Sequence, residues 1–225
     1  IYKLYENGKK MSGELPLDLA KDEAAGVFES MRAYHGRIFH EEEHLARLLE
    51  SAKTVGYRPM PDPARLRQEL AAALKAFGAK ECFVRLTLWE GRSLVALGFR
   101  EHPKEIYEKG VALKTATFPR GGPNTFPWQV KASAYQQAIL ASTEPHPEKV
   151  YEWVFLDREG LLTETRVGNF FLVKYPKQPC GLSRSNPRGW MGKHVELLTP
   201  PGHGILNGVT RGFVIKCALE CGMQV

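Results

Sequence analysis

The stretch PRGGPNTFPWQVKASAY, residues 119–135, divides the sequence and contains its most informative residue, Lys131. Its first nine residues are rich in glycine and proline, a composition typical of a connector between two domains. A lysine in such a setting is ordinarily a solvated surface charge whose stem covers apolar atoms. Ligand sites often lie between domains, however, so a lysine that follows a connector is also a candidate site residue.

Periodicity and turn residues predict one domain on each side of this connector. Residues 1–118 are predicted to form an N-terminal α+β domain, residues 119–127 the connector, and residues 128–225 a C-terminal domain. Alternating apolar residues predict strands, and apolar residues at helical spacing predict amphipathic helices. The predicted strands are 1–6, 27–34, 37–39, 82–88, 94–99, 111–118 and several within 153–174, and the predicted helices are 41–55, 62–77, 131–141 and 210–221. Residues 175–196 have no strong periodicity.

Composition excludes several classes of function. The chain has 225 residues, 43% of them hydrophobic, which is enough to bury a substantial core. The formal net charge is +6, but lysine and arginine are scattered among acidic residues, without the basic runs of a nucleic-acid-binding protein. No apolar run approaches the roughly 20 residues of a membrane span, and the N-terminus resembles a strand and turn rather than a signal peptide.

The four cysteines indicate neither disulfides nor a metal site. They lie at positions 82, 180, 217 and 221, without a CxxC pair or a histidine at zinc-finger spacing. Reduced thiols of this kind are typical of a cytoplasmic protein. We therefore expect a soluble protein with no bound metal.

Two further stretches suggest a site for an acidic group and an anion. The stretch LDREGLL, residues 156–162, predicts a hairpin that delivers Glu164 at a strand end. The stretch GVTR, residues 208–211, opens the last predicted helix, with Thr210 as a possible cap and Gly208 allowing close backbone approach. Free amides and the helix dipole at such a start favour a phosphate group. The simpler alternative is an ordinary capped helix that binds nothing.

Together these motifs resemble a known enzyme family. The stretches GVFESMRAY (26–34) and HLARLLESA (44–52), then Lys131, Glu164 to Asn169 and residues 208–211, follow the order found in fold type IV pyridoxal-phosphate enzymes. This family includes branched-chain aminotransferases, D-amino acid aminotransferases and aminodeoxychorismate lyases. The resemblance implies an α+β fold with a small N-terminal α/β domain and a larger C-terminal pseudo-barrel domain. Relatives continue beyond the position of Val225, so the C-terminal domain is expected to be incomplete.

The resemblance also assigns roles to cofactor-site residues. Lys131 would form a Schiff base with pyridoxal 5'-phosphate and later act as the general base. Glu164 would pair with the pyridine nitrogen, and Asn169 would also contribute to cofactor binding. Arg47 would contact the phosphate together with Gly208, Val209 and Thr210. Outside this resemblance, Arg47 is expected to form ion pairs on a helix surface.

The substrate is less clearly indicated. Tyr34, Arg32 and Arg85 are candidates for the substrate pocket, because comparable positions serve this purpose in some relatives. Tyr135 follows Lys131 by four residues, as in D-amino acid aminotransferases and the lyase, whereas residues 28–34 and 123–127 resemble branched-chain enzymes.

The implied activity is amino-group transfer between an amino acid, perhaps branched-chain, and a 2-oxo acid such as 2-oxoglutarate, by a homodimer. One alternative is an aminodeoxychorismate lyase that releases pyruvate and 4-aminobenzoate. Another is a non-catalytic remnant that still binds the cofactor.

Overall fold

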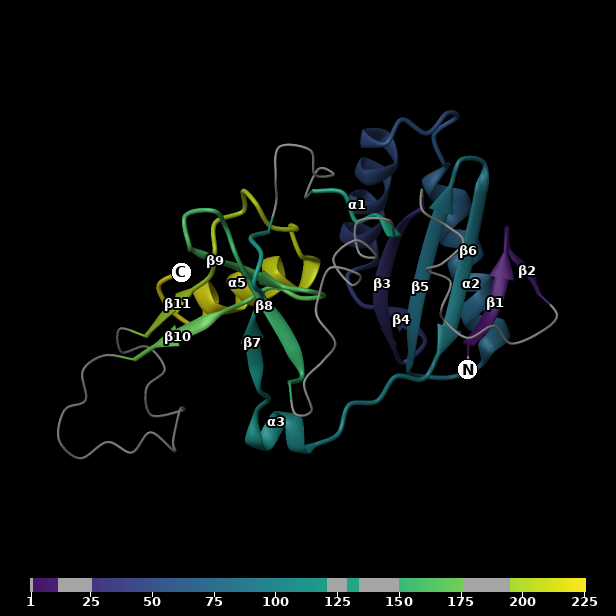
Figure 1. Ribbon diagram of the computed structural model, residues 1–225. Coiled ribbons are helices and arrows are strands. Elements are labelled where there is room, and N and C mark those ends of the chain that lie inside the picture. Colours follow the sequence, from purple (N-terminus) through teal and green to yellow (C-terminus); the bar gives the residue numbers. More distant parts are fainter. Residues whose placement is uncertain (1, 12–25, 121–128, 134–149, 176–194) are drawn as a thin grey trace. The chain divides into compact units, whose positions relative to one another are not determined.

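The computed structural model describes residues 2–11, 26–120, 129–133, 150–175 and 195–225. The chain divides into two compact units (Figure 1). The first contains the described residues up to Val111 together with 129–133, and the second contains the rest. Residues 121–128 of the predicted connector, most of the predicted helix 131–141 and nearly all of 175–196 lie outside the described residues, so those predictions stand as made.

The first unit is built on a six-stranded antiparallel sheet. Both predicted hairpins are present, with β3 pairing β4 and β5 pairing β6. The strand order is β2-β1-β6-β5-β3-β4, so β3 lies between β5 and the two-residue β4. The strands are β1 Tyr2–Glu6, β2 Lys9–Lys10, β3 Val27–Tyr34, β4 Arg37–Ile38, β5 Cys82–Trp89 and β6 Arg92–Gly98.

Two helices cover one face of this sheet, α1 Glu41–Thr54 and α2 Pro63–Phe77 (Figure 1). Both confirm the predicted helices. The Asp62 side chain caps α2 by accepting a hydrogen bond from the Ala64 amide at 3.0 Å, and proline follows at the first helical position. Gly78 ends the helix at a φ of 76°, a left-handed conformation that glycine adopts without steric cost. Apolar side chains from the helices and the sheet form the core, among them Leu45, Leu48, Leu70, Val84, Leu86 and Leu97.

Alternation along β3 sends its side chains to opposite faces of the sheet. Glu29 shares the helix-covered face with Val27 and Met31, which belong to the core. Phe28 lies on the other face, as does Arg85, which pairs with Ser30 across the strands. The face that a residue of β3 occupies therefore decides whether it meets α1 or the opposite side of the sheet.

Residues 129–133 also belong to the first unit. The Phe28 amide donates to the Lys131 carbonyl at 2.9 Å, and the Ser133 amide donates to the Gly26 carbonyl at 2.8 Å. These bonds add a short edge segment beside the start of β3, with Val27 bridged to Ala132. The backbone of Lys131 is therefore fixed on the sheet of the first unit.

The second unit contains two small sheets and a helix. β7 runs parallel to β8, β8 is antiparallel to β9, and β10 pairs with β11. Trp153, Phe155 and Ile205 are buried, and the Phe118 ring meets Phe155 edge-on at 5.6 Å between centroids. The elements are β7 Leu113–Thr115, β8 Glu152–Leu156, β9 Leu162–Thr165, β10 Leu172–Lys174, β11 Glu196–Leu198 and α5 Val209–Glu220. The final helix was predicted correctly.

Three strand and helix predictions need correction. The strand predicted at 111–118 is only three residues long, and the short helix α3 Glu105–Lys109 before it was not predicted. The apolar stretch from Gly168 forms a strand only at β10. Gly168 instead lies in a tight turn, because its amide donates to the Thr165 hydroxyl at 3.0 Å and its carbonyl accepts from the Thr165 amide.

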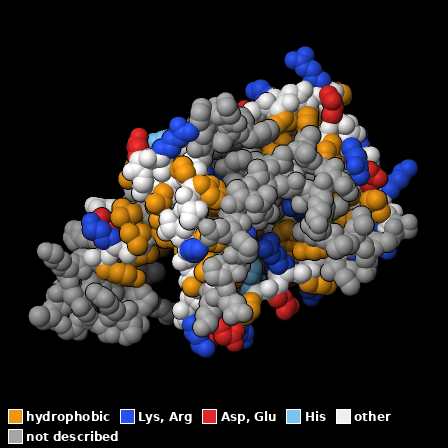
Figure 2. All heavy atoms as spheres, viewed as in Figure 1, with side chains coloured by type: hydrophobic (Ala, Val, Ile, Leu, Met, Phe, Trp, Pro, Cys, Tyr) orange, Lys and Arg blue, Asp and Glu red, His pale blue; other side chains and the backbone are white. Residues whose placement is uncertain are grey.

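The described surface carries mixed charges. Figure 2 shows lysine and arginine side chains at separate points around the visible face, some of them beside acidic side chains. Among the helices that the structure describes, none is long and apolar enough to cross a bilayer.

Candidate active site

A buried ionic cluster lies between β3 and α1 of the first unit. Glu29 is fully buried, and its two carboxylate oxygens accept from Arg47 Nε and Nη2 at 2.6 Å each. His44 Nδ1 lies 2.7 Å from the same carboxylate. Burial alone would raise the pKa of Glu29, but the bonds to His44 and Arg47 and the nearby charge of Lys131 lower this pKa to about 2. The carboxylate is therefore ionised.

This lowered pKa predicts how stability depends on pH. Because the folded-state pKa lies below the ordinary value of 4.5, Glu29 stabilises the fold above about pH 4.5 and loses this contribution as pH falls toward 2. The full contribution is about 3 kcal/mol, of which about 2 kcal/mol is lost by pH 3. Denaturant unfolding of the wild type and of Glu29→Gln tests this prediction. The stability gap between them should narrow from about pH 5.5 to about pH 3, and an unchanged gap would contradict it.

Lys131 lies beside this cluster. Its backbone amide is 3.4 Å from the hydroxyl of Ser51, one helical turn after Arg47 on α1. Its Nζ lies 5.3 Å from the centre of the Phe28 ring, and the Arg85 guanidinium carbon lies 3.8 Å from the same ring. The structure thus brings the predicted site residues Lys131, Arg47 and Arg85 to the start of β3.

The other two predicted substrate residues lie further along β3. Arg32 Nη1 donates to the Arg100 carbonyl at 2.6 Å, and its guanidinium lies 6.0 Å from the Tyr34 ring. Tyr34 is 46% exposed and meets the Phe39 ring edge-on. These contacts give both side chains a structural explanation, and their role in a substrate pocket stays a prediction.

Glu164 is the centre of a second buried cluster, within the second unit. It lies near the end of β9, as predicted, and is 3% exposed. Its carboxylate accepts from the Leu206 amide at 2.9 Å and from Asn169 Nδ2 at 3.0 Å. Arg120 Nη2 lies 2.6 Å from the same carboxylate, and both side chains are almost fully buried. Asn169 also donates to the Leu206 carbonyl at 2.9 Å, so it is held from two sides.

The start of α5 differs from the prediction in one respect. Gly208 is the N-cap and no side chain caps the helix, so the prediction that Thr210 caps it was wrong. The helix begins one residue earlier, with Thr210 already inside its first turn. Arg211 holds this turn in place by donating to the Thr199 hydroxyl at 3.2 Å and to the Pro200 carbonyl at 2.8 Å. The first amides of a helix have no partner within it, so those of Val209 and Thr210 are oriented to bind an anion.

Gly208 is required by packing rather than by backbone conformation. Its φ is −66°, which any residue can adopt, but a Cβ there would overlap Oδ1 of Asn169. We predict that Gly208→Ala displaces Asn169 from Glu164 and lowers stability by about 1–3 kcal/mol, the usual cost of overpacking. Gly212→Ala, where a Cβ meets nothing within 4 Å, is the matched control and should stabilise α5 by about 0.5–1 kcal/mol. Equal stabilities of the two variants in thermal unfolding would refute this explanation.

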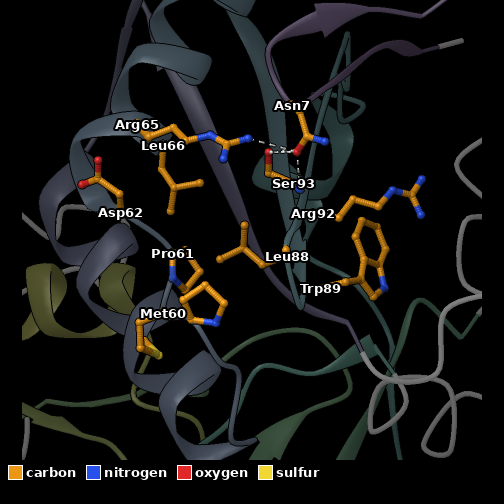
Figure 3. A pocket seen from close by; sticks show the side chains of 12 residues that line it. Asn7, Met60, Pro61, Asp62, Arg65, Leu66, Leu88, Trp89, Arg92 and Ser93 are labelled. Carbon is orange, nitrogen blue, oxygen red and sulfur yellow. Dashed lines mark hydrogen bonds between the residues drawn. The ribbon is translucent and has the colours of Figure 1, made fainter.

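The first unit also contains a pocket of about 200 Å³ at the start of α2 (Figure 3). Figure 3 shows Met60 and Leu66 on one side of it and Trp89 and Arg92 on the other. Arg65 Nη2 lies 3.4 Å from the side-chain oxygen of Asn7 at its rim. None of the predicted site residues lines this pocket, so it is separate from them.

Sequence reasoning missed three residues of the two clusters, Glu29, His44 and Arg120. Glu29 occupies an inward position of an alternating strand, and a charged residue there signals a buried partner. His44 and Arg47 lie three residues apart on one helix, the spacing that places two side chains on the same face. Arg120 lies within the predicted connector, where a charge is ordinarily solvated. These signals could have identified Glu29 and His44, but not Arg120.

The family of the chain follows from a match over most of its length. The family model for amino-transferase class IV matches residues 26–225. The chain belongs to this family, which confirms the resemblance derived from its motifs. Members are transaminases that use pyridoxal 5'-phosphate, so the predicted enzyme class and cofactor are also confirmed.

The relatives narrow this class to enzymes with branched-chain names. The protein named "Probable branched-chain-amino-acid aminotransferase" of Rickettsia conorii is 27% identical over 215 residues, covering 90% of this chain and 67% of that protein. The chain thus spans about two thirds of that curated relative.

Two solved structures share the fold. The branched-chain amino acid aminotransferase of Escherichia coli has a TM-score of 0.77 at 21% identity, over 99% of this chain and 76% of that one. A putative branched-chain amino acid aminotransferase of Thermotoga maritima has a TM-score of 0.75 at 24% identity, over 100% of this chain and 75% of that one. This likeness confirms the predicted α+β fold type IV.

Proposed function

We propose that this protein transfers the amino group of a branched-chain amino acid to a 2-oxo acid such as 2-oxoglutarate, with Lys131 holding the cofactor. The observation that carries the proposal is the setting of Lys131, whose amine lies over Phe28 beside the buried Glu29 and Arg47 pair. A primary amine that sits next to a fixed carboxylate and guanidinium fits an aldehyde cofactor that carries a phosphate. The branched-chain substrate is supported by the names of the relatives.

Lys131 has two tasks in this proposal. Its Nζ bonds covalently to the aldehyde carbon of pyridoxal phosphate, and a substrate amine displaces it from there. The freed amine then acts as a general base that moves a proton between the substrate Cα and the cofactor C4′. When bound, the cofactor supplies an electron sink for the negative charge that develops at Cα. The backbone bonds of residues 131–133 to β3 keep the lysine in position for both tasks.

Glu164 is the proposed partner of the pyridine nitrogen. An ionised carboxylate there favours the protonated nitrogen, which accepts electrons more readily. Arg120 supports this role because a cation at 2.6 Å in a buried setting favours the ionised form of Glu164. Asn169 fixes the orientation of the same carboxylate through its hydrogen bond.

The phosphate is assigned to Arg47 and to the start of α5. Arg47 offers charge-assisted donors, and the amides of Val209 and Thr210 offer the positive end of a helix dipole. The absence of a Cβ on Gly208 keeps Asn169 close to this start. The Thr210 hydroxyl is a further proposed donor to the phosphate.

The substrate carboxylate is assigned to Arg85, with Arg32 and Tyr34 as further pocket residues. Arg85 is favoured among them because it shares the Phe28 ring with Lys131. A homodimer and a cytoplasmic location remain predictions from the sequence.

Product analysis tests this function against its alternatives. The purified protein is incubated with pyridoxal phosphate, 2-oxoglutarate and either L-leucine, L-isoleucine or L-valine, and glutamate is measured. Glutamate formation with these substrates supports the proposal, and turnover restricted to D-amino acids would change the substrate class. Pyruvate released from aminodeoxychorismate without any amino acceptor would instead identify a lyase. Cofactor binding without turnover of any of these would leave a non-catalytic protein.

A further inference from the structure

Glu29 occupies a position where a carboxylate is costly. It lies on the helix-covered face of β3 among core residues and is fully buried. Replacing a buried ion pair by packed apolar side chains is often neutral or stabilising, so burial of this pair is weak evidence for a stability role. Its presence needs another explanation, and the contacts of Arg47 provide one.

The bond between Glu29 and Arg47 fixes the plane of the guanidinium. Arg47 uses Nε and Nη2 on the two separate oxygens of one carboxylate, a bidentate pair in which neither group can rotate independently. The edge of the guanidinium that carries Nη1 is consequently turned away from Glu29. His44 holds the carboxylate from a third direction at 2.7 Å. An arginine on a helix normally samples many side-chain conformations, and this one is limited to a single orientation.

The same carboxylate is coupled to Lys131. Lys131 is close enough for its charge to stabilise the ionised form of Glu29, and its amide contacts Ser51, one turn beyond Arg47. Glu29 thus faces two cations to which the proposed function gives different tasks. Arg47 has the phosphate, and Lys131 has the aldehyde carbon.

We propose that Glu29 is a positioning residue, which holds the Arg47 guanidinium in the orientation that binds the cofactor phosphate. This inference rests on the proposed function, because it needs Arg47 to meet that phosphate. Glu29 itself touches neither the cofactor nor the substrate. Its effect should therefore depend on whether a ligand carries a phosphate group.

Paired ligands test this dependence. Dissociation constants for pyridoxal phosphate and for pyridoxal, which lacks the phosphate, are measured by absorbance titration of the wild type and Glu29→Gln. We expect Glu29→Gln to weaken pyridoxal phosphate binding by roughly tenfold, the cost of ordering one released side chain, and to leave pyridoxal binding nearly unchanged. Competition by inorganic phosphate should weaken by a similar factor.

Glu69→Gln is the matched control. Glu69 is also a buried carboxylate of the first unit, bonded to the Ser93 hydroxyl and to Arg65, but it lies on α2 away from Lys131. A purely structural role of Glu29 would make both variants behave alike or would weaken both ligands by the same factor, and either result overturns the proposal. If Glu29→Gln does not fold, His44→Gln provides the decision, because it loosens the carboxylate while leaving the ion pair. It should show the same ligand dependence with a smaller change.

The two levels of the proposal fail differently. If the wild type binds no pyridoxal phosphate, the proposed function is wrong and this inference falls with it. If the wild type binds the cofactor but Glu29→Gln shows no preference between the paired ligands, only the positioning role is wrong.

Discussion

Replacing Lys131 by alanine will remove the covalent cofactor adduct and lower transamination by at least about 10⁴-fold, because anchor and general base are lost together. Borohydride reduction of the wild type with pyridoxal phosphate, followed by mass spectrometry, should locate a pyridoxyl group on Lys131. The alanine variant should show no such group at any residue. Its absorbance spectrum should be that of free cofactor in solution.

Lys131→Arg is the matched control for charge. A guanidinium keeps the positive charge beside Glu29 but stays protonated and cannot react with an aldehyde as a lysine amine does. We expect the arginine variant to keep its fold and to lose the adduct as completely as the alanine variant. An adduct on another lysine, or activity retained by either variant, would show that Lys131 does not hold the cofactor.

Glu164→Gln is expected to destabilise the second unit by about 3–5 kcal/mol, because it leaves the buried Arg120 guanidinium without its counter-charge. Glutamine also cannot accept all the hydrogen bonds that now come from Leu206, Asn169 and Arg120. Denaturant unfolding followed by the fluorescence of Trp153, which is buried in the same unit, measures this loss. A change below about 1 kcal/mol would mean that the ion pair contributes little.

The double variant Arg120→Met with Glu164→Gln separates stability from cofactor binding. Removing both charges should recover part of the lost stability, since no uncompensated charge stays buried. The activity should nevertheless remain low, because the partner of the pyridine nitrogen is still absent. If activity returned together with stability, Glu164 would have only a structural role.

Local signals in the sequence explain which parts of the fold could be predicted. Asp62 followed by proline, and Gly78 after the last apolar position, mark the two ends of α2 without any tertiary information. The hairpins of the first unit are likewise defined by alternation and by glycine turns. β7, β10 and β11 have only three residues each and are held by their partners, so their bounds depend on contacts that periodicity does not report.

The site shows the same division. Lys131, Glu164 and residues 208–211 could be selected because each occupies a recognisable position in a motif. The pairing of Glu29 with Arg47 joins a strand to a helix 18 residues later, and that of Arg120 with Glu164 joins residues 44 apart. Such pairs depend on how elements pack. A single sequence gives the charges but not their partners.

The backbone pairing of residues 131–133 with β3 has a consequence for solubility. β4 pairs only with the last two residues of β3, so the beginning of that strand would otherwise be an open sheet edge with the apolar residues Val27 and Phe28. Unpaired edges of this kind can recruit strands from other molecules and start aggregation. The segment that carries Lys131 therefore also shields this edge. Changes that loosen the segment should make the protein prone to aggregate as well as poor at retaining its cofactor.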